Sequence, residues 1–423
     1  MSQTTPPPDL PGETTSDVAQ RLANWRRTGD PASLWPNVRS DQLTMAHSLI
    51  ARTTSAVLRG TARKPTLGEA GSCHRDAIGI AAFVSGMGPL LGYWIEAELI
   101  DADEEISGLL HLHLQHSRER VARINTAFLR LLEALNDRGL APIVFKGIYT
   151  SRSYFPEPAT RPIADIDLLV EAEQRTRAAE ALRATGFVEL GVDTPGQTAW
   201  RLPSASESVH SLQLEHRNNP WAVDLHTTID KRYFRGCWAS FGPHPFRSAN
   251  AWNVDGLSAR VFGQPLLTAH LAQHATYTIH ELRLVRLVEL ILVTRRDIAE
   301  GTLEWDSLAA FLRETGTTRF VYPALELAER ITPGLIEPAF RHALAAASTR
   351  RMRRVIDHIA ASGMHMAGRG TVSERFVWAR GPWEVTKNFT DFIWPPARSA
   401  SERWRKYGKW LRMAMRGRLA MRS

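Results

Sequence analysis

Apolar residues in the middle of the chain recur with two different periods, and they predict a helix followed by short buried strands. Apolar side chains repeat at three- and four-residue steps from Val121 to Leu135, which predicts one face of a helix. Gly139 suits the left-handed position that ends many helices, so we expect the helix to stop there. A continuous apolar run follows over residues 141–145, and residues 163–170 are mostly apolar. Their length and flanking turn residues indicate strands.

A second helix and further strands complete this unit. Residues 171–186 are rich in Ala, Glu and Arg and end in glycine, which predicts a helix leading into another short strand. Residues 210–216 and 221–229 alternate between polar and apolar side chains and are joined by four turn-forming residues, so they predict a β-hairpin. Residues 136–235 therefore form the predicted α/β core.

Helical patterns flank this core on both sides. Beyond Gly263 the apolar spacing is helical, and shorter helical patterns precede residue 106. Before the core we expect a disordered lead-in over residues 1–40 and an N-terminal helical region over residues 41–135. After it we expect a C-terminal helical domain over residues 236–395 and a basic amphipathic tail over residues 396–423.

The uncharged stretch from Ala77 to Ile95 is just long enough to cross a membrane. Glycine and proline residues interrupt it, and residues 85–89 read as a break between two helices. Such breakers favour a buried helical hairpin over one spanning helix.

The composition of the 423 residues, with 43% hydrophobic and 23% charged residues, is ordinary for a soluble protein of two or three domains. Cys73 and Cys237 show no metal-ligand spacing, which argues against a disulfide framework or a structural zinc site. The N-terminus lacks the basic and apolar regions of a signal peptide. These features predict a cytoplasmic location.

The net charge of +8 is concentrated at the C-terminus. From Ser399 onward there are eight basic residues and one acidic residue, so this tail carries +7 and the body is nearly neutral. The tail could dock on the body, touch an anionic membrane surface weakly or bind nucleic acid, and we favour docking first and membrane contact second. We expect no stable nucleic-acid partner.

Three acids interrupt the predicted strands. Asp165 and Asp167 are two residues apart on one strand, so they point to the same face, and Asp224 lies between apolar residues on a later strand. Carboxylates this close repel each other unless a cation lies between them. Two acids and a third from a neighbouring strand suit two Mg²⁺ ions.

A glycine turn precedes these acids. Lys146 and Gly147 follow the first strand and open a helix, whose free N–H groups would attract phosphates. Lys146 adds a positive charge, and Thr150, Ser151 and Arg161 are nearby donors in sequence. The order of strand, Lys-Gly turn, Asp-x-Asp strand and later strand acid is more specific than any one of its parts.

This ordered set resembles the nucleotidyltransferase superfamily typified by DNA polymerase β, and within it a bacterial family of uncharacterised nucleotidyltransferases. The resemblance covers roughly residues 110–310 and rests on "VFKG", "YFPEP", "TRPIADIDLLV" and "AVDLH" in the same order, with the helical segment from 266 onward. It implies an α+β fold, in which a small mixed β-sheet domain with helices is embedded between N- and C-terminal helical regions.

The resemblance also implies roles for individual residues. Asp165 and Asp167 would be metal ligands, Asp224 the third acid that helps activate the acceptor, and Gly147 a lining of the phosphate site. His226 and Arg161 match recurring motif positions without an implied role. Two features depart from the pattern: the phosphate turn has a single glycine, and Glu289 stands where an Asp is common.

We therefore predict a Mg²⁺-dependent enzyme that transfers NMP from an NTP such as ATP to an unidentified hydroxyl or phosphate acceptor of a small molecule, peptide or protein. The alternative is a non-catalytic nucleotide-binding or regulatory protein on the same scaffold. His270, His274 and His280 could be read as a zinc set, but packing or a polar role in a cleft is favoured because no third ligand is evident.

Overall fold

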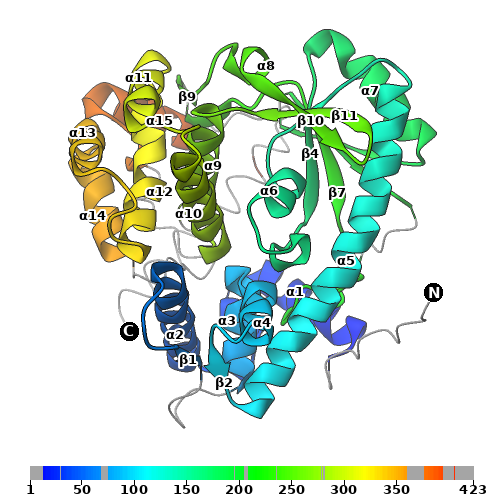
Figure 1. Cartoon of the computed structure of the whole chain (residues 1–423), viewed down its shortest axis with the longest axis vertical. Helices are drawn as coiled ribbons and strands as arrows, with labels where there is room; N and C mark the ends of the chain where they lie inside the picture. The colour runs from blue at the N-terminus through cyan, green and yellow to red at the C-terminus, as the bar shows by residue number, and fades with distance from the viewer. Residues whose placement is uncertain are drawn as a thin grey trace.

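The computed structural model describes residues 13–28, 30–67, 75–194, 196–203, 208–234, 236–277, 279, 282–359, 376–393 and 404. Within them the fold is α+β, as predicted: a mixed sheet lies at one end of the molecule, with helices around it and beyond it (Figure 1). The tail expected over 396–423 lies outside the described residues apart from Trp404.

The sheet has seven strands within the described residues, in the order β10-β11-β3-β4-β7-β6-β5. β4 lies at its centre, antiparallel to β3 and parallel to β7. The strands are β3 (Ile143–Val144), β4 (Asp165–Leu169), β5 (Val188–Thr194), β6 (Gln197–Arg201), β7 (Ala222–His226), β10 (Ala249–Val254) and β11 (Leu257–Phe262).

Two predictions about the sheet need correction. The hairpin predicted from residues 210–216 and 221–229 is wrong, because the antiparallel neighbour of β7 is β6. Residues 210–216 contain no strand: the Trp35 indole donates to the Leu212 carbonyl, and His216 N donates to the Leu214 carbonyl. The sheet also extends past residue 235, since β11 pairs with β3.

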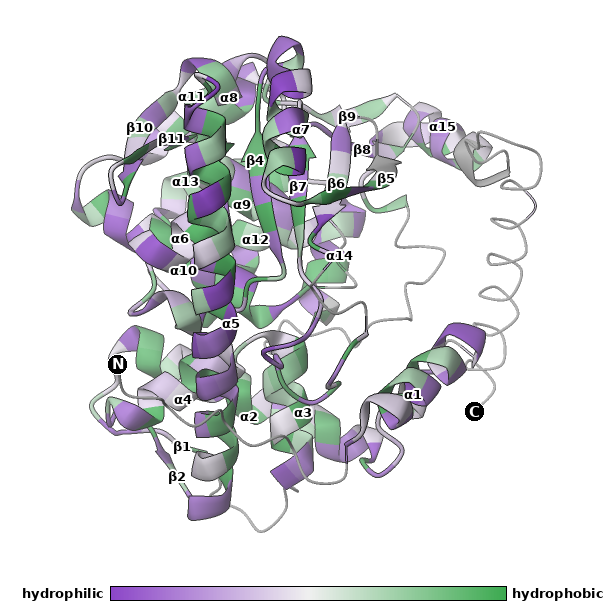
Figure 2. Cartoon of the chain, turned by 90° about the vertical axis from the view of Figure 1, so that its right-hand side faces the viewer, coloured by the Kyte–Doolittle hydropathy of each residue, from purple (hydrophilic) through white to green (hydrophobic). Residues whose placement is uncertain are grey.

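The helix predicted from Val121 to Leu135 is part of α5 (Glu104–Asn136), whose 33 residues span about 50 Å. Figures 1 and 2 show α5 running from the sheet to the helices at the opposite end of the molecule. Its apolar face and α7 (Arg175–Ala184) share a core with one side of the sheet, which includes Phe128, Ile166 and Val223.

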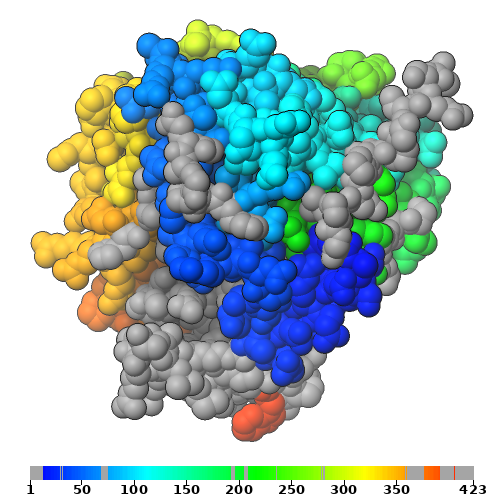
Figure 3. All heavy atoms as spheres, turned by 90° about the horizontal axis from the view of Figure 1, so that it is seen from below, coloured from blue at the N-terminus to red at the C-terminus, as the bar shows by residue number. Residues whose placement is uncertain are grey.

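The N-terminal part is helical, with α1 (Thr15–Thr28), α2 (Ser40–Arg59), α3 (Arg75–Ser85) and α4 (Gly88–Glu96). α1 lies within the lead-in that the sequence suggested to be disordered. The helices α2 to α4 lie beside the C-terminal helices on the face shown in Figure 3. The Ser55 hydroxyl on α2 donates to the carbonyl of Ile331, on one of those C-terminal helices, at 2.6 Å.

The uncharged stretch from Ala77 to Ile95 forms two helices, α3 and α4, bent by 112° at the expected break. Within the described residues no single helix meets the length and hydropathy required to cross a membrane, although this bent pair meets them jointly. Its glycines allow close packing on α5, since a Cβ on Gly92 would lie 2.4 Å from the Leu110 carbonyl oxygen. Most residues of the pair are buried, as the hairpin prediction requires.

Beyond Gly263 the described chain is helical, as predicted. The helices are α9 (Leu266–Thr276), α10 (Leu284–Ala299), α11 (Trp305–Glu314), α12 (Thr318–Ile331), α13 (Pro338–Ala347), α14 (Arg350–His358) and α15 (Gly381–Ile393). They share one large apolar core with α2, α3 and α4.

Short elements connect these parts. They are η1 (Pro31–Ser33), β1 (Thr66–Leu67), β2 (Asp101–Ala102), α6 (Ile148–Ser153), η2 (Pro158–Thr160), η3 (Ala172–Gln174), β8 (Lys231–Phe234), β9 (Cys237–Ala239) and α8 (His244–Arg247). Of these, α6 follows the glycine turn after β3, at the position predicted for a short helix.

Candidate active site

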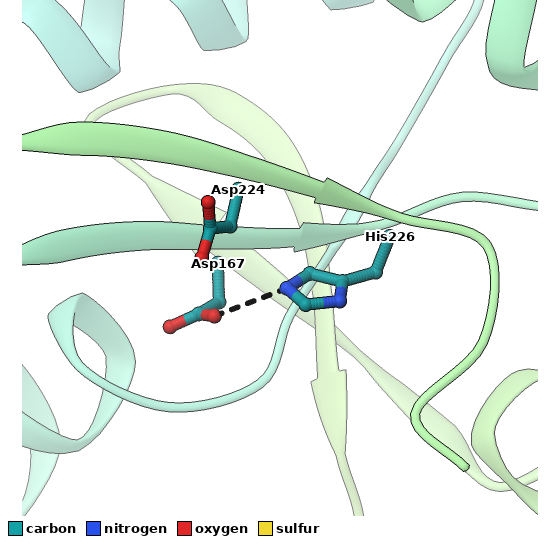
Figure 4. Close-up of side chains that lie close together, drawn as sticks. All are labelled: Asp167, Asp224 and His226. Carbon is teal, nitrogen blue, oxygen red and sulfur yellow. Dashed lines mark hydrogen bonds and ion pairs between the residues drawn. The ribbon is translucent and has the colours of Figure 1, made fainter. Parts of the chain in front are cut away.

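The three acids predicted from the sequence lie on the neighbouring strands β4 and β7. Asp165 and Asp167 alternate with buried Ile166 and Leu168 and so occupy one face of β4. The parallel register places Asp167 directly beside Asp224. Figure 4 shows both carboxylates on the same side of the strands, with His226 next to Asp167.

Asp167 is buried, with 2% of its surface exposed, and it has two cationic or proton-donating neighbours. Lys146 Nζ lies 2.7 Å from Asp167 Oδ2, and His226 Nε2 lies 3.2 Å from Oδ1. Burial opposes ionisation of this carboxyl, but Lys146 and His226 outweigh it and hold its pKa well below its usual range. Asp167 is therefore an ionised ligand candidate at neutral pH.

Asp224 has a different environment from Asp167. Its Oδ2 accepts a hydrogen bond from Gln197 Nε2 at 2.8 Å, and Gln197 lies on the adjacent strand β6. Burial, reinforced by the negative charges of Asp167 and Asp165, raises the pKa of Asp224 to about 7. This carboxyl can therefore exchange a proton near neutral pH.

Lys146 is directed at the carboxylates. Its ammonium also lies 3.5 Å from Asp165 Oδ2, and 8% of the residue is exposed. Burial works against its charge, yet the attraction of Asp165 and Asp167 raises the pKa of Lys146. Lys146 is thus the counter-ion of both acids, and its predicted role at the phosphates stays a prediction.

The donor set suits a hard divalent cation. One ligand atom from each of Asp167, Asp224 and His226 lies within 4.8 Å of the others, and Asp165 extends the same face toward solvent. Two carboxylates this close raise the pKa of one of them, and an ion bound between them removes that repulsion. The structure thus brings together two of the predicted metal ligands, Asp167 and Asp224, and the third member of the cluster is His226 rather than Asp165.

Gly147 adopts a backbone conformation that favours glycine, with φ of 58° and ψ of −101°. A Cβ built on it would lie 3.5 Å from the Asp165 carbonyl oxygen and 3.9 Å from Arg161 NH1. The glycine turn, the start of the Asp-x-Asp strand and Arg161 are thus close together in space, and the phosphate site stays a prediction.

Arg161 is held by Glu289, a partner that the sequence did not indicate. Its Nε and NH2 donate to the two carboxylate oxygens of Glu289 at 2.8 and 3.0 Å. Glu289 is 2% exposed and also accepts the Thr150 hydroxyl. Although burial opposes the charge, Glu289 raises the pKa of Arg161. Glu289 therefore connects α10 to the loop that contains Arg161 and to the helix that contains Thr150, and both lie beside the glycine turn.

Two other predicted groups do not join this arrangement. Ser151 is fully buried, and its hydroxyl donates to the Ile148 carbonyl at 3.0 Å, within its own helix. His270 and His274 stack with their rings 6.1 Å apart, and burial lowers the pKa of both. His280 lies outside the described residues, and His270 packs against Phe145 and Phe262, as the packing interpretation predicts.

Arg120 of α5 is a second residue that the sequence analysis missed. Its guanidinium is 1% exposed and donates to the carbonyls of Ile163, Asn219 and Pro220. Ile163 comes two residues before Asp165, and Pro220 comes four residues before Asp224. Arg120 thus ties together the chain segments that enter the two acid-bearing strands. Arg120 is one of four arginines on this long helix, and nothing in the sequence distinguishes it for this role.

The sequence model of one protein family, described as uncharacterised nucleotidyltransferase, matches residues 77–333, which is more than half of the chain. The matched span contains the carboxylate cluster, Gly147 and the Arg161–Glu289 pair. No curated protein and no solved structure matches the chain.

Proposed function

Because the chain belongs to the uncharacterised nucleotidyltransferase family and is an enzyme of that class, we propose that it transfers NMP from an NTP to a hydroxyl or phosphate acceptor. A bond forms between the acceptor oxygen and the α-phosphorus, and the bond from that phosphorus to the bridging oxygen breaks, which releases pyrophosphate. The Asp-x-Asp strand favours an assignment to the superfamily typified by DNA polymerase β. We further propose that the enzyme acts in a bacterial cytoplasm.

The observation that carries this proposal is the register of β4 and β7, which brings Asp167 and Asp224 side by side on one face. Asp165, Asp167 and Asp224 would hold two Mg²⁺ ions. Bound Mg²⁺ neutralises phosphate charge and lowers the pKa of an attacking hydroxyl. Without a cation, Lys146 is what compensates Asp165 and Asp167.

Individual residues of the chain activate the acceptor and bind the triphosphate. Asp224 accepts the proton of an acceptor hydroxyl, and Gln197 orients the carboxylate through its hydrogen bond. The Gly147 turn and Arg161 lie beside the acids and bind the triphosphate. Lys146 contributes positive charge to the same region, and Ser151 supports α6 from within rather than touching phosphate.

A second candidate is a nucleotide-binding or regulatory protein without turnover. The pairing of Lys146 with both Asp165 and Asp167 favours it, because an ammonium there competes with a metal ion for the same oxygens. The two candidates share nucleotide binding and differ in product formation. Only the enzyme has an acceptor, which is a small molecule, peptide or protein.

The test is the release of pyrophosphate from each of the four NTPs with Mg²⁺, assayed with cell extract as the source of acceptor. We expect release with the wild-type protein and none with Asp165→Asn or Asp167→Asn. Activity that survives both substitutions contradicts the enzyme mechanism. Binding of NTP with no product from any extract supports the regulatory alternative.

A further inference from the structure

The contact between Arg161 and Glu289 joins parts of the chain that are 128 residues apart. Arg161 lies in the loop before β4, and Glu289 lies on α10 of the C-terminal helices. Both side chains are largely removed from solvent, with exposed fractions of 12% and 2%. A buried ion pair adds little net stability compared with apolar residues, so its presence beside the acids needs another explanation.

The geometry of the pair leaves one edge of the guanidinium turned away from Glu289. Nε and NH2 are used by the carboxylate, whereas NH1 makes one 3.3 Å contact, with the Pro162 carbonyl, among the described residues. An arginine NH1 carries two N–H groups, so it retains donor capacity. This same nitrogen is the one that lies 3.9 Å from the Cβ position of Gly147.

Glu289 also fixes the other side of the glycine turn. Thr150, on the first turn after Gly147, donates its hydroxyl to Glu289 and lies 3.2 Å from the Gly147 carbonyl. The carboxylate therefore holds Arg161 and α6 in one arrangement. Loss of its charge would release both at once.

We propose that Glu289 is a positioning residue for nucleotide binding: it holds Arg161 so that the NH1 edge, beside Gly147, receives a phosphate oxygen of the triphosphate. This inference rests on the proposed function. Glu289 itself touches no substrate. The C-terminal helices thereby contribute to the phosphate site through a residue that the sequence motif does not contain.

A matched control exists elsewhere in the chain. Glu326 of α12 has a side chain that is 8% exposed and accepts from Nε and NH2 of Arg341, at 2.9 and 2.7 Å. The contact has the same two-bond geometry as the Arg161–Glu289 pair and joins two helices of the C-terminal part. The Arg341 side chain is 41% exposed, and Glu326 also accepts from Arg330 Nε at 3.2 Å. Glu326→Gln therefore reports the structural cost of removing such a carboxylate.

The experiment measures binding of two probes in the presence of Mg²⁺: the tightest-binding NTP in its α,β-methylene form, and inorganic tripolyphosphate. We expect Glu289→Gln to raise the Kd of both probes by about 10- to 100-fold, the range for a lost charge-assisted hydrogen bond. Turnover should show the same rise in KM for NTP, with kcat changed less than about threefold. Glu326→Gln should lower the melting temperature comparably and leave both Kd values within about twofold.

Three results overturn the proposal. Kd values for Glu289→Gln that match those for Glu326→Gln assign Glu289 a purely structural role. Weaker NTP binding with unchanged tripolyphosphate binding places its effect at the base or ribose. If the wild-type protein binds neither probe, the proposed function fails and this inference fails with it.

A second variant covers the case in which Glu289→Gln does not fold. Arg161→Met combined with Glu289→Met replaces the pair by apolar side chains, which proteins often tolerate without loss of stability. We expect this folded variant to bind tripolyphosphate at least about tenfold more weakly than the wild type. Binding at the wild-type level would falsify the assignment.

Discussion

Strands β4 and β7 carry acids at the same level of the sheet, but the two strands give them opposite proton affinities. Asp167 on β4 faces Lys146 and His226, and its pKa is held well below its usual range despite burial. Asp224 on β7 is desolvated and faces the other two acids, with Gln197 as its neutral donor, and its pKa is raised to about 7.

The difference shows that register alone does not determine the chemistry of a carboxylate. Lys146, in the turn after β3, keeps Asp167 ionised, so that this acid can act as a ligand. Asp224, beside Gln197 on β6, can instead gain and lose a proton. Pairs of acids whose environments push their pKa values apart are typical of acid–base sites.

The largest effect is expected from Asp167→Asn in the metal-free protein. The change leaves the buried Lys146 without its closest partner, so the free energy of unfolding at pH 7 should fall by about 3 kcal/mol. The lowered pKa of Asp167 means that its contribution is present above about pH 4 and is lost as the pH falls further. Urea denaturation at pH 7 and pH 3 measures both, and an equal loss at the two pH values would contradict this assignment.

Lys146→Met should destabilise the metal-free protein by about 2 kcal/mol, because Asp165 and Asp167 then lack their counter-ion. Mg²⁺ should recover more stability in this variant than in the wild type, since no ammonium competes for the oxygens. Thermal melting with Mg²⁺ and with EDTA tests this. Lys64→Met is the control: its pair with Asp101 is exposed, and it should cost less than about 1 kcal/mol with no dependence on Mg²⁺.

Asp224→Asn should change the free energy of unfolding of the metal-free protein in the opposite direction to Asp167→Asn. Ionising a group whose folded pKa is raised destabilises the folded state, and this cost develops as the pH rises from about 4 to about 7. Without metal, we expect the variant to be more stable than the wild type at pH 8 and equal to it at pH 4. Denaturation at these two pH values in EDTA measures this difference in stability. A variant less stable than the wild type at pH 8 would mean that Asp224 and Asp167 do not differ in their effect on stability.

Gln197→Leu should have the smallest effect on stability, about 0.5–1.5 kcal/mol for the lost hydrogen bond to Asp224. That bond favours the ionised carboxylate, so its loss should raise the pKa of Asp224 further. The acid limb of the pH–rate profile should move to higher pH by less than about one unit. A limb that stays in place means that another group titrates there.

The carboxylate half of the site was predictable because it depends on local patterns. The two-residue period of a strand places Asp165 and Asp167 on one face, and an acid between Val223 and Leu225 marks a second strand of the same kind. The glycine turn and the short helix after it follow from equally local signals.

The remaining parts depend on contacts between distant residues. Glu289 and Arg161 are 128 residues apart, and Arg120 reaches chain segments about 40 and 100 residues away. Alternation in residues 210–216 suggested a strand, but side chains and turns satisfy the backbone there instead. The acidic partners of Lys146 were not predictable for the same reason, since they are fixed by how β3 and β4 lie in the sheet.

The parallel pairing of β4 and β7 also has a consequence for folding. Antiparallel neighbours such as β5 and β6 can form from a local hairpin, whereas a parallel pair requires a crossover, here spanning residues 170–221. Closing so long a loop slows this step relative to local pairing. We therefore expect the acids to meet late in folding, after the helices and hairpins that hold them have formed.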